Sequence, residues 1–242
     1  MPSLLLLIPI TLVAYTFEAV FGLAGTVLLL TVFGLFSDGE TMKLLVIYSL
    51  LPQAIGQTIG LVRVPTKINF KALGQFFISA TIGALLGLYL FESLDSKIFF
   101  YLLAGVITFS GLSMIYKPGK FKLNIIHKLI FDFLAGVGGI LFGISGPLVV
   151  TRFLSTFKNK TAIRNHTFVV FLAFNAIRLV RYLTKDPISI TPEIWKAMYI
   201  SAPLLIIVLW FANYLHLKVN EKVFRTVIAW VVLIGGVMLF FK

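Results

Sequence analysis

The sequence predicts an all-α, polytopic membrane protein with two inverted repeats, each with a re-entrant broken helix plus three transmembrane helices. Composition is the first reason: 59% of the 242 residues are apolar and only 12% are charged. A soluble domain carries about 25% charged residues, so this chain has too few charges to cover a water-facing surface. The other two reasons are an internal sequence match and an uneven distribution of Lys and Arg.

Eight apolar segments follow one another along the chain. They fall at about 3–36, 42–62, 70–91, 97–116, 129–154, 162–183, 194–215 and 223–241. Six have the ~20 residues that one helix needs to cross a ~30 Å hydrocarbon core. The first and the fifth are longer, and each contains a glycine cluster. We therefore expect six crossing helices and two broken ones.

The two glycine clusters share a pattern and mark a duplication. Residues 21–26 read FGLAGT and residues 142–147 read FGISGP, so both fit F-G-x-[AS]-G-[TP] at an offset of 121 residues. Met42-Lys43 matches Ile163-Arg164 at the same offset. We expect a first transmembrane repeat over 1–121 and a second over 122–242 in one integral membrane domain. Internal repeats of this kind are common in secondary transporters.

Lys and Arg decide whether the broken segments cross the membrane. If all eight segments crossed, basic connections would lie on both faces, against the positive-inside rule. If the first and fifth segments dip in and return, fourteen basic residues share one face with only Asp132 and Glu221, and the other face carries six charges of each sign. The fourteen are Arg63, Lys67, Lys71, Lys117, Lys120, Lys122, Lys128, Arg152, Lys158, Lys160, Arg164, Lys218, Lys222 and Arg225.

The re-entrant arrangement fixes the orientation. Three crossings per repeat is an odd number, so the repeats must be inverted. The basic loops are then cytoplasmic and both termini lie outside, in a multi-pass protein of the cell (inner) membrane. The N-terminus lacks a basic region and a cleavage site, which favours a retained first segment. The net charge of +12 is thus an orientation signal, and no nucleic-acid partner is expected.

The glycine breaks are the strongest indication of a binding site. Non-helical backbone at mid-membrane depth costs several kcal/mol per unpaired group unless it packs in protein or lines a wet cavity. Each half-helix after a break would present free N–H groups and about half a positive charge, which suits an anion. The alternative is that these glycines only allow close helix packing. The predicted anion-binding residues here are Gly22, Gly25, Thr26, Gly143, Ser145 and Gly146.

These paired Gly-rich breaks, in a duplicated chain of this length, resemble the TauE/SafE sulfite exporter family over essentially the whole sequence. The resemblance implies a transporter of small sulfur-containing or organic anions, such as sulfite, sulfonates or sulfoacetate, working by alternating access. The chain departs from the family pattern at Ala24 and Thr26, where a glycine-richer break is expected. Residues 48–50 lack a Thr-Ser pair associated with the family. Both departures bear on which anion is the substrate and leave the expected fold unchanged.

Polar residues inside apolar segments complete the predicted site. Arg178 stands between Ile177 and Leu179, and a charge at membrane depth is a functional candidate by default. Asn175 precedes it by one turn, and Gln53 and Gln57 lie on the duplicated segment. The alternative is that Arg178 extends to the outer face with Arg181.

Three charged residues lie close to the broken segments. Glu18, one turn before Gly22, is a candidate for proton coupling or for pairing with Arg178, and otherwise a buried structural acid. We expect Asp132 near the interface with Lys128 as its partner. We expect Arg152 at the cytoplasmic end of its half-helix.

Other function classes have weaker support. Gly143-Ile144-Ser145-Gly146 fits the G-x-S-G pattern of rhomboid intramembrane proteases, but the other repeat has Ala24 in place of the serine. A passive anion channel is a third interpretation. The chain has no cysteine, and its three histidines lack metal-ligand spacing, so we expect no metal, no cofactor and no enzyme. Expected partners are a small anionic substrate and the lipid bilayer. Proton or cation coupling and a homodimer are compatible with the sequence.

The orientation can be tested by fusing a reporter of membrane sidedness to each end of the chain. Both reporters should respond as external, because three crossings per repeat return the chain to its starting face. A cytoplasmic C-terminal reporter would contradict the re-entrant arrangement.

Overall fold

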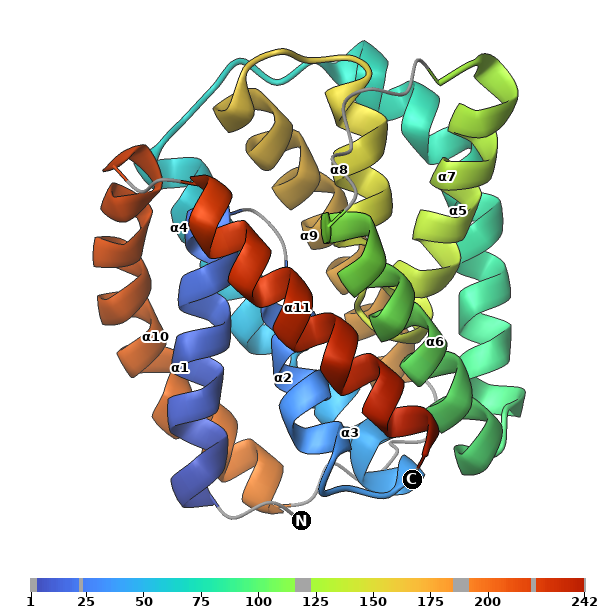
Figure 1. The fold of residues 1–242 in the computed structure, drawn as a ribbon, viewed down its shortest axis with the longest axis vertical. Coiled ribbons are helices and arrows are strands. Elements are labelled where there is room, and N and C mark those ends of the chain that lie inside the picture. The colour runs from blue at the N-terminus through green and yellow to red at the C-terminus, as the bar shows by residue number, and fades with distance from the viewer. Residues whose placement is uncertain (1–3, 22–23, 116–122, 185–191, 219–220, 242) are drawn as a thin grey trace.

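The computed structural model describes residues 4–21, 24–115, 123–184, 192–218 and 221–241, and all regular secondary structure in this part of the chain is helical (Figure 1). The helices are α1 (Leu4–Phe21), α2 (Gly25–Gly34), α3 (Gly39–Tyr48), α4 (Leu50–Arg63), α5 (Phe70–Ser93), α6 (Ser96–Ile115), α7 (Ile125–Leu141), α8 (Gly146–Leu154), α9 (Lys160–Thr184), α10 (Pro192–Lys218) and α11 (Glu221–Phe240). The predicted all-α polytopic class is confirmed.

Five helices are long and apolar enough to cross a membrane. They are Gly39–Arg63, Phe70–Ser93, Ser96–Ser113, Lys160–Thr184 and Pro192–Tyr214. Each coincides with a predicted crossing. The first consists of α3 and α4, which meet at Ser49. Pro52, the third residue of α4, has no N–H to donate to a helical hydrogen bond. The sixth predicted crossing is α11, whose described apolar stretch Ala229–Phe240 is shorter.

Both broken segments are helical hairpins. α1 ends at Phe21 and α2 begins at Gly25, while α7 ends at Leu141 and α8 begins at Gly146. In Figure 1, α2 turns back toward the lower end of the bundle, where α1 starts. α8 turns back toward the upper end, where α7 starts. Gly143 has φ 69° and Ala24 has φ 84°. Ala24 therefore holds a left-handed conformation that costs an L-residue about 1–2 kcal/mol.

Helix pairs in the first predicted repeat and helix pairs in the second pack in corresponding ways. The offset matches α1 with α7 and α5 with α10, and the packed pairs include both α1 with α10 and α5 with α7. The matched helices α6 and α11 also pack on each other, as do α4 and α9. This packing agrees with two halves related by an approximate two-fold axis. The inverted repeat and its boundary at 121/122 remain predictions.

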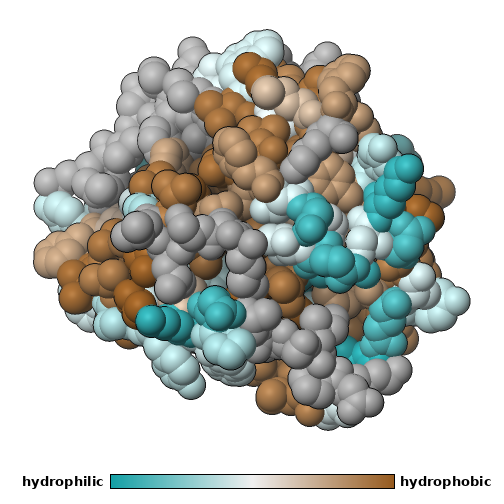
Figure 2. All heavy atoms as spheres, turned by 90° about the horizontal axis from the view of Figure 1, so that it is seen from below, coloured by the Kyte–Doolittle hydropathy of each residue, from teal (hydrophilic) through white to brown (hydrophobic). Residues whose placement is uncertain are grey.

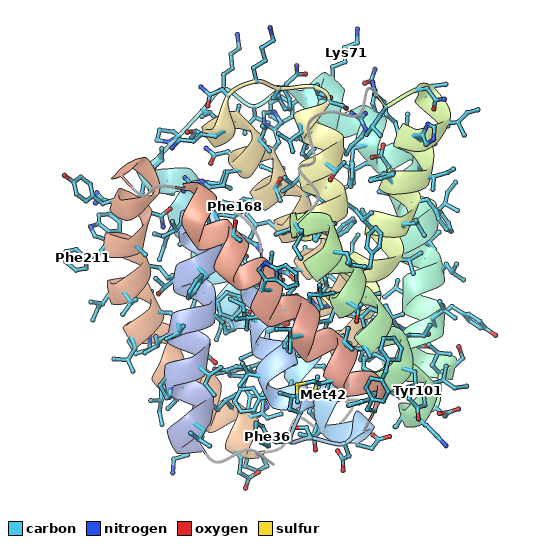
Figure 3. The ribbon with its side chains drawn as sticks, in the orientation of Figure 1. Phe36, Met42, Lys71, Tyr101, Phe168 and Phe211 are labelled. Atoms are coloured by element: carbon cyan, nitrogen blue, oxygen red, sulfur yellow. The ribbon has the colours of Figure 1, made fainter. Side chains whose placement is uncertain are left out.

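Apolar side chains project outward around the bundle. Phe211 on α10 projects beyond the bundle in Figure 3 and is 69% exposed, and Tyr101 on α6 is 42% exposed. Met42 and Phe168 are buried inside. The lower end, seen in Figure 2, shows hydrophilic patches among apolar residues. Outward-facing aromatic and aliphatic side chains are suited to contact with lipid.

The close packing of α5 on α7 predicts an unequal response to two glycine substitutions on α5. A Cβ at Gly83 would collide with the Phe133 carbonyl oxygen of α7, whereas a Cβ at Gly74 would meet nothing within 4 Å. Gly83→Ala should cost about 1–3 kcal/mol through overpacking. Gly74→Ala should leave stability unchanged or raise it, because alanine favours helix. Thermal unfolding in detergent measures both, and equal shifts would contradict the close packing.

Candidate functional site

The polar residues predicted from sequence come together between the two helix breaks. The buried ones are Glu18, Thr26, Gln53, Gln57, Ser145, Asn175 and Arg178. Gly25 and Gly146 are also buried, as the first residues of α2 and α8. Gly22 lies outside the described residues. The seven side chains come from α1, α2, α4, α9 and the loop before α8, so the fold, and not chain proximity, assembles them.

Gln53 on α4 connects the two breaks directly. Its Nε2 donates to Thr26 Oγ1 at 2.9 Å and to the Gly143 carbonyl oxygen at 3.2 Å. Tyr15 hydrogen-bonds Thr26 Oγ1 at 3.1 Å and donates to the Ser49 carbonyl at 3.2 Å. Sequence reasoning missed Tyr15, although its i, i+3 spacing to Glu18 puts both on one helix face. A single amide thus joins the start of α2 to the break before α8.

Glu18 occupies the N-terminus of α2. Gln57 Nε2 donates to Glu18 Oε1 at 3.0 Å. A Cβ on Gly25 would lie 2.5 Å from Glu18 Oε2, so the carboxyl group lies directly beside the first residue of α2. An acid is favourable there, because a helix N-terminus carries partial positive charge. Binding of a substrate anion by the N–H groups of Gly25 and Thr26 stays a prediction, with the Glu18 carboxyl group beside them.

Arg178 is the largest fully buried side chain among the described residues. Its Nη1 donates to Asn175 Oδ1 at 3.2 Å, and its Nη2 donates to the Val46 carbonyl oxygen at 2.5 Å. Only 1% of Arg178 is exposed, so it does not extend to the outer face. Arg181 is partly exposed and pairs with Glu92. Arg178 therefore belongs to the polar interior.

A relay of side chains links Arg178 to Glu18 without an ion pair. Asn175 Nδ2 donates to Gln57 Oε1 at 3.4 Å, and Gln57 in turn donates to Glu18. No ion pair between the two charges occurs among the described residues. The direct pairing of Glu18 with Arg178 considered above is thus replaced by a connection through two amides.

The guanidinium of Arg178 borders the second break. A Cβ on Gly143 would lie 2.8 Å from Nη1, and the positive φ of Gly143 also favours glycine beside this cation. Within the described part of the chain, Arg178 Nε has no hydrogen-bond partner. The N-terminus of α8 has no side-chain cap from Ser145. Donors at the start of α8 and on Arg178 therefore remain available to an acceptor, and no acidic side chain serves them.

Two further arginines are buried that sequence reasoning placed at the cytoplasmic surface. Arg164 is 2% exposed and donates to the carbonyls of Ala19 at 3.0 Å and Gly60 at 3.2 Å, near the ends of α1 and α4. It also donates to Asn213 Oδ1 on α10 at 3.2 Å. These carbonyls lie in last helical turns, which carry partial negative charge and attract cations. Arg164 therefore joins α1, α4, α9 and α10.

Arg152 forms a buried ion pair with Asp132. The Nε–Oδ1 distance is 3.2 Å, and the two side chains are 4% and 1% exposed. From the sequence we expect Lys128 as the partner of Asp132, whereas the structure pairs Asp132 with Arg152, because the packing of α7 and α8 puts Arg152 against it. An interfacial position for Asp132 stays a prediction. This pair stabilises the second hairpin and lies apart from Arg178 in the hydrogen-bond network.

The histidine that the structure describes inside the bundle has a structural role. His166 Nε2 accepts from the Asn69 N–H at 2.8 Å, and Nδ1 lies 2.7 Å from the Ala162 carbonyl oxygen, to which it donates in that tautomer. Both ring nitrogens are therefore occupied, and His166 is not available as a base for Ser145. The side chain of His216 lies outside the described residues. Among described residues no group of three His, Cys, Asp or Glu could hold a metal ion.

Comparison with known proteins gives one family. A sequence model described as sulfite exporter TauE/SafE matches residues 7–239, which is nearly the whole chain. Searches of curated proteins and of solved structures found no significant match.

The buried Asp132–Arg152 pair predicts strongly non-additive substitutions. Asp132→Leu alone leaves a buried cation without its partner and should destabilise the protein by about 3–5 kcal/mol. The double substitution Asp132→Leu with Arg152→Met should recover most of this loss, because an apolar pair removes both desolvation costs. A double-mutant cycle followed by thermal unfolding measures the coupling. Additive losses would show that the two charges do not interact.

Proposed function

This chain belongs to the sulfite exporter TauE/SafE family of membrane anion exporters, and on that basis we propose that it is a secondary transporter of small sulfur-containing or organic anions. Alternating access moves the anion across the cytoplasmic membrane. The substrate site lies between the two Gly-broken helices, at the start of α8. The observation that supports this site most is the unsatisfied donor on a fully buried arginine.

Charge balance among the buried residues leads to Arg178. The buried charged side chains in the described chain are Glu18, Asp132, Arg152, Arg164 and Arg178. Asp132 and Arg152 neutralise each other. Carbonyl oxygens and an amide oxygen surround Arg164, and the Gln57 amide donates to Glu18. Arg178 alone keeps a buried N–H without an acceptor. A buried cation without a partner costs several kcal/mol, and an anionic substrate would supply the missing acceptor.

The start of α8 adds to the same potential. The first N–H groups of a helix have no intrahelical acceptor, and the helix dipole favours an anion there. Pro147, the second residue of α8, has no N–H to satisfy. Ser145 and Gly146 then supply the remaining donors, with Gly143 giving room for the guanidinium. Gln53, Gln57 and Asn175 hold these groups in place from α4 and α9.

Two sets of polar contacts enclose the site along the helix axes. On the side of the basic loops, Arg164 joins α1 and α4 to α10. On the other side, Tyr48 Oη lies 3.0 Å from Thr11 Oγ1 and donates to Ser201 Oγ at 3.3 Å. Opening one set at a time would expose the site to one face. Each set joins helices of both proposed repeats, as alternating access by relative motion of the repeats requires.

We also propose how the chain is oriented in the membrane and how anion transport is coupled to a cation gradient. Residues 1–121 and 122–242 form the two inverted halves, with the basic loops cytoplasmic and both termini outside. The bilayer covers the exposed apolar side chains. Coupling to a proton or another cation supplies the driving force, with Glu18 as the candidate proton carrier.

Arg178→Ala should weaken sulfite binding about 10- to 100-fold, because hydrogen bonds to charged groups contribute about 1.5–3 kcal/mol. Arg181→Ala is the matched control: it removes the same charge one turn away, from an arginine paired with Glu92, and should leave affinity unchanged. Binding to purified protein and flux into proteoliposomes measure both. Unaltered affinity and flux in Arg178→Ala would remove Arg178 from the site.

The same proteoliposomes separate a transporter from a passive channel. A coupled transporter accumulates anion above its electrochemical equilibrium when a proton or cation gradient is imposed. Flux that stops at equilibrium under every gradient would favour the channel. Cleavage of a membrane substrate that is lost in Ser145→Ala would favour the protease.

A further inference from the structure

The outer surface of the bundle carries one arginine that lies against a tryptophan of another helix. Arg63 is the last residue of α4 and is exposed, and its guanidinium carbon lies 4.1 Å from the centre of the Trp210 ring on α10. Trp210 is 43% exposed, and its neighbour Phe211, which projects from the bundle in Figure 3, is 69% exposed. Val62 beside Arg63 is 66% exposed. The cation therefore stands at the edge of an apolar surface suited to lipid.

The Trp210 ring positions the Arg63 guanidinium and leaves its donors available. The attraction between a cation and an indole ring acts on the charge and needs no conventional hydrogen bond. A guanidinium has five N–H donors and no acceptor. Among the residues that the structure describes, no carboxylate pairs with Arg63, and no carbonyl or hydroxyl oxygen accepts a hydrogen bond from it. Arg63 is thus a positioned cation whose donors can bind an external acceptor.

The first half of the chain shows no matching arrangement. The large exposed side chains in the middle of α5, the predicted repeat mate of α10, are all apolar or aromatic: Ile78, Ile82, Leu85 and Tyr89. At the 121-residue offset, the residue that corresponds to Arg63 is Thr184. A charge that only orients the chain in the membrane needs no aromatic partner on a neighbouring helix. The contact between Arg63 and Trp210 therefore needs an explanation of its own.

The phosphate of a membrane phospholipid fits this arrangement. A phosphate accepts two hydrogen bonds at once from a guanidinium, and tryptophan rings are frequent at the depth of the lipid head groups. Arg63 is one of the basic residues that the sequence assigns to the cytoplasmic face, where anionic lipids give the leaflet a negative potential. A zwitterionic lipid has the same phosphate, but the cation of its head group would be repelled by Arg63. An anionic head group therefore fits best.

We propose that the surface formed by Arg63 and Trp210, where α4 packs on α10, is a binding site for an anionic phospholipid. The lipid phosphate accepts hydrogen bonds from Arg63 beside the Trp210 ring. The acyl chains lie along exposed apolar side chains of α10, among them Phe211 and Ile207, which is 57% exposed. The site is on the outside of the bundle, and this inference does not rest on the proposed anion transport.

Native mass spectrometry of the purified full-length protein tests the site with equal amounts of phosphatidylglycerol and phosphatidylcholine. Wild-type protein should retain phosphatidylglycerol in preference. Arg63→Ala should lower this preference about tenfold, because it removes the charge and its hydrogen bonds. Trp210→Leu keeps the charge and loses the ring that positions it, so it should also lower the preference. Lys71→Ala is the matched control, since Lys71 is an exposed cation at the start of α5, at the upper end of Figure 3.

Three results would overturn the proposal. The first is a wild type that retains both lipids equally, a measurement that does not depend on the folding of any variant. The second is a loss in Lys71→Ala as large as that in Arg63→Ala, since diffuse attraction to the basic face would then suffice. The third is a dimer that Trp210→Leu dissociates without a change in bound lipid, which would show that a second copy of the chain covers this surface.

Discussion

Unpaired backbone groups at the two helix breaks are the constraint on which the rest of this structure depends. In a membrane interior such groups have no water to bond, so each must find a partner in the protein or in a ligand. At the α1–α2 break the Glu18 carboxyl group lies beside the first residue of α2, and at the α7–α8 break the Gly143 carbonyl accepts from Gln53. The helices that surround the hairpins, α4 and α9 above all, supply the amides that complete this arrangement.

The same constraint makes the two halves unequal in function. In the proposed duplication the two helix ends are equivalent, but Glu18 stands beside the start of α2 and Gly139 takes the equivalent position near the start of α8. Arg178 then adds a full positive charge near the second of these ends, where it replaces the amide of Gln57 in the repeat. In the proposed function, the approximate symmetry of the packing would serve movement between the halves, and the departure from symmetry would serve binding.

Sequence reasoning located the breaks, because the glycine clusters recur at a fixed offset inside over-long apolar segments. It also selected Gln53, Gln57, Asn175 and Arg178, since polar residues stand out in an apolar helix. It could not give the role of Glu18, which depends on how the chain folds back at the start of α2. Nor could it show that Arg152 and Arg164 are buried. Their positions beside basic loops look like a surface, and their partners come from distant helices.

The most direct test of the account is to locate a bound anion by its scattering. Crystals or frozen grids of the protein with selenite, a heavier analogue of sulfite, would show one selenium site. The account places it within hydrogen-bonding distance of Arg178 Nε and of the first N–H groups of α8, with Glu18 still at the start of α2. A selenium site at the start of α2 with Glu18 displaced, or one remote from both breaks, would contradict it.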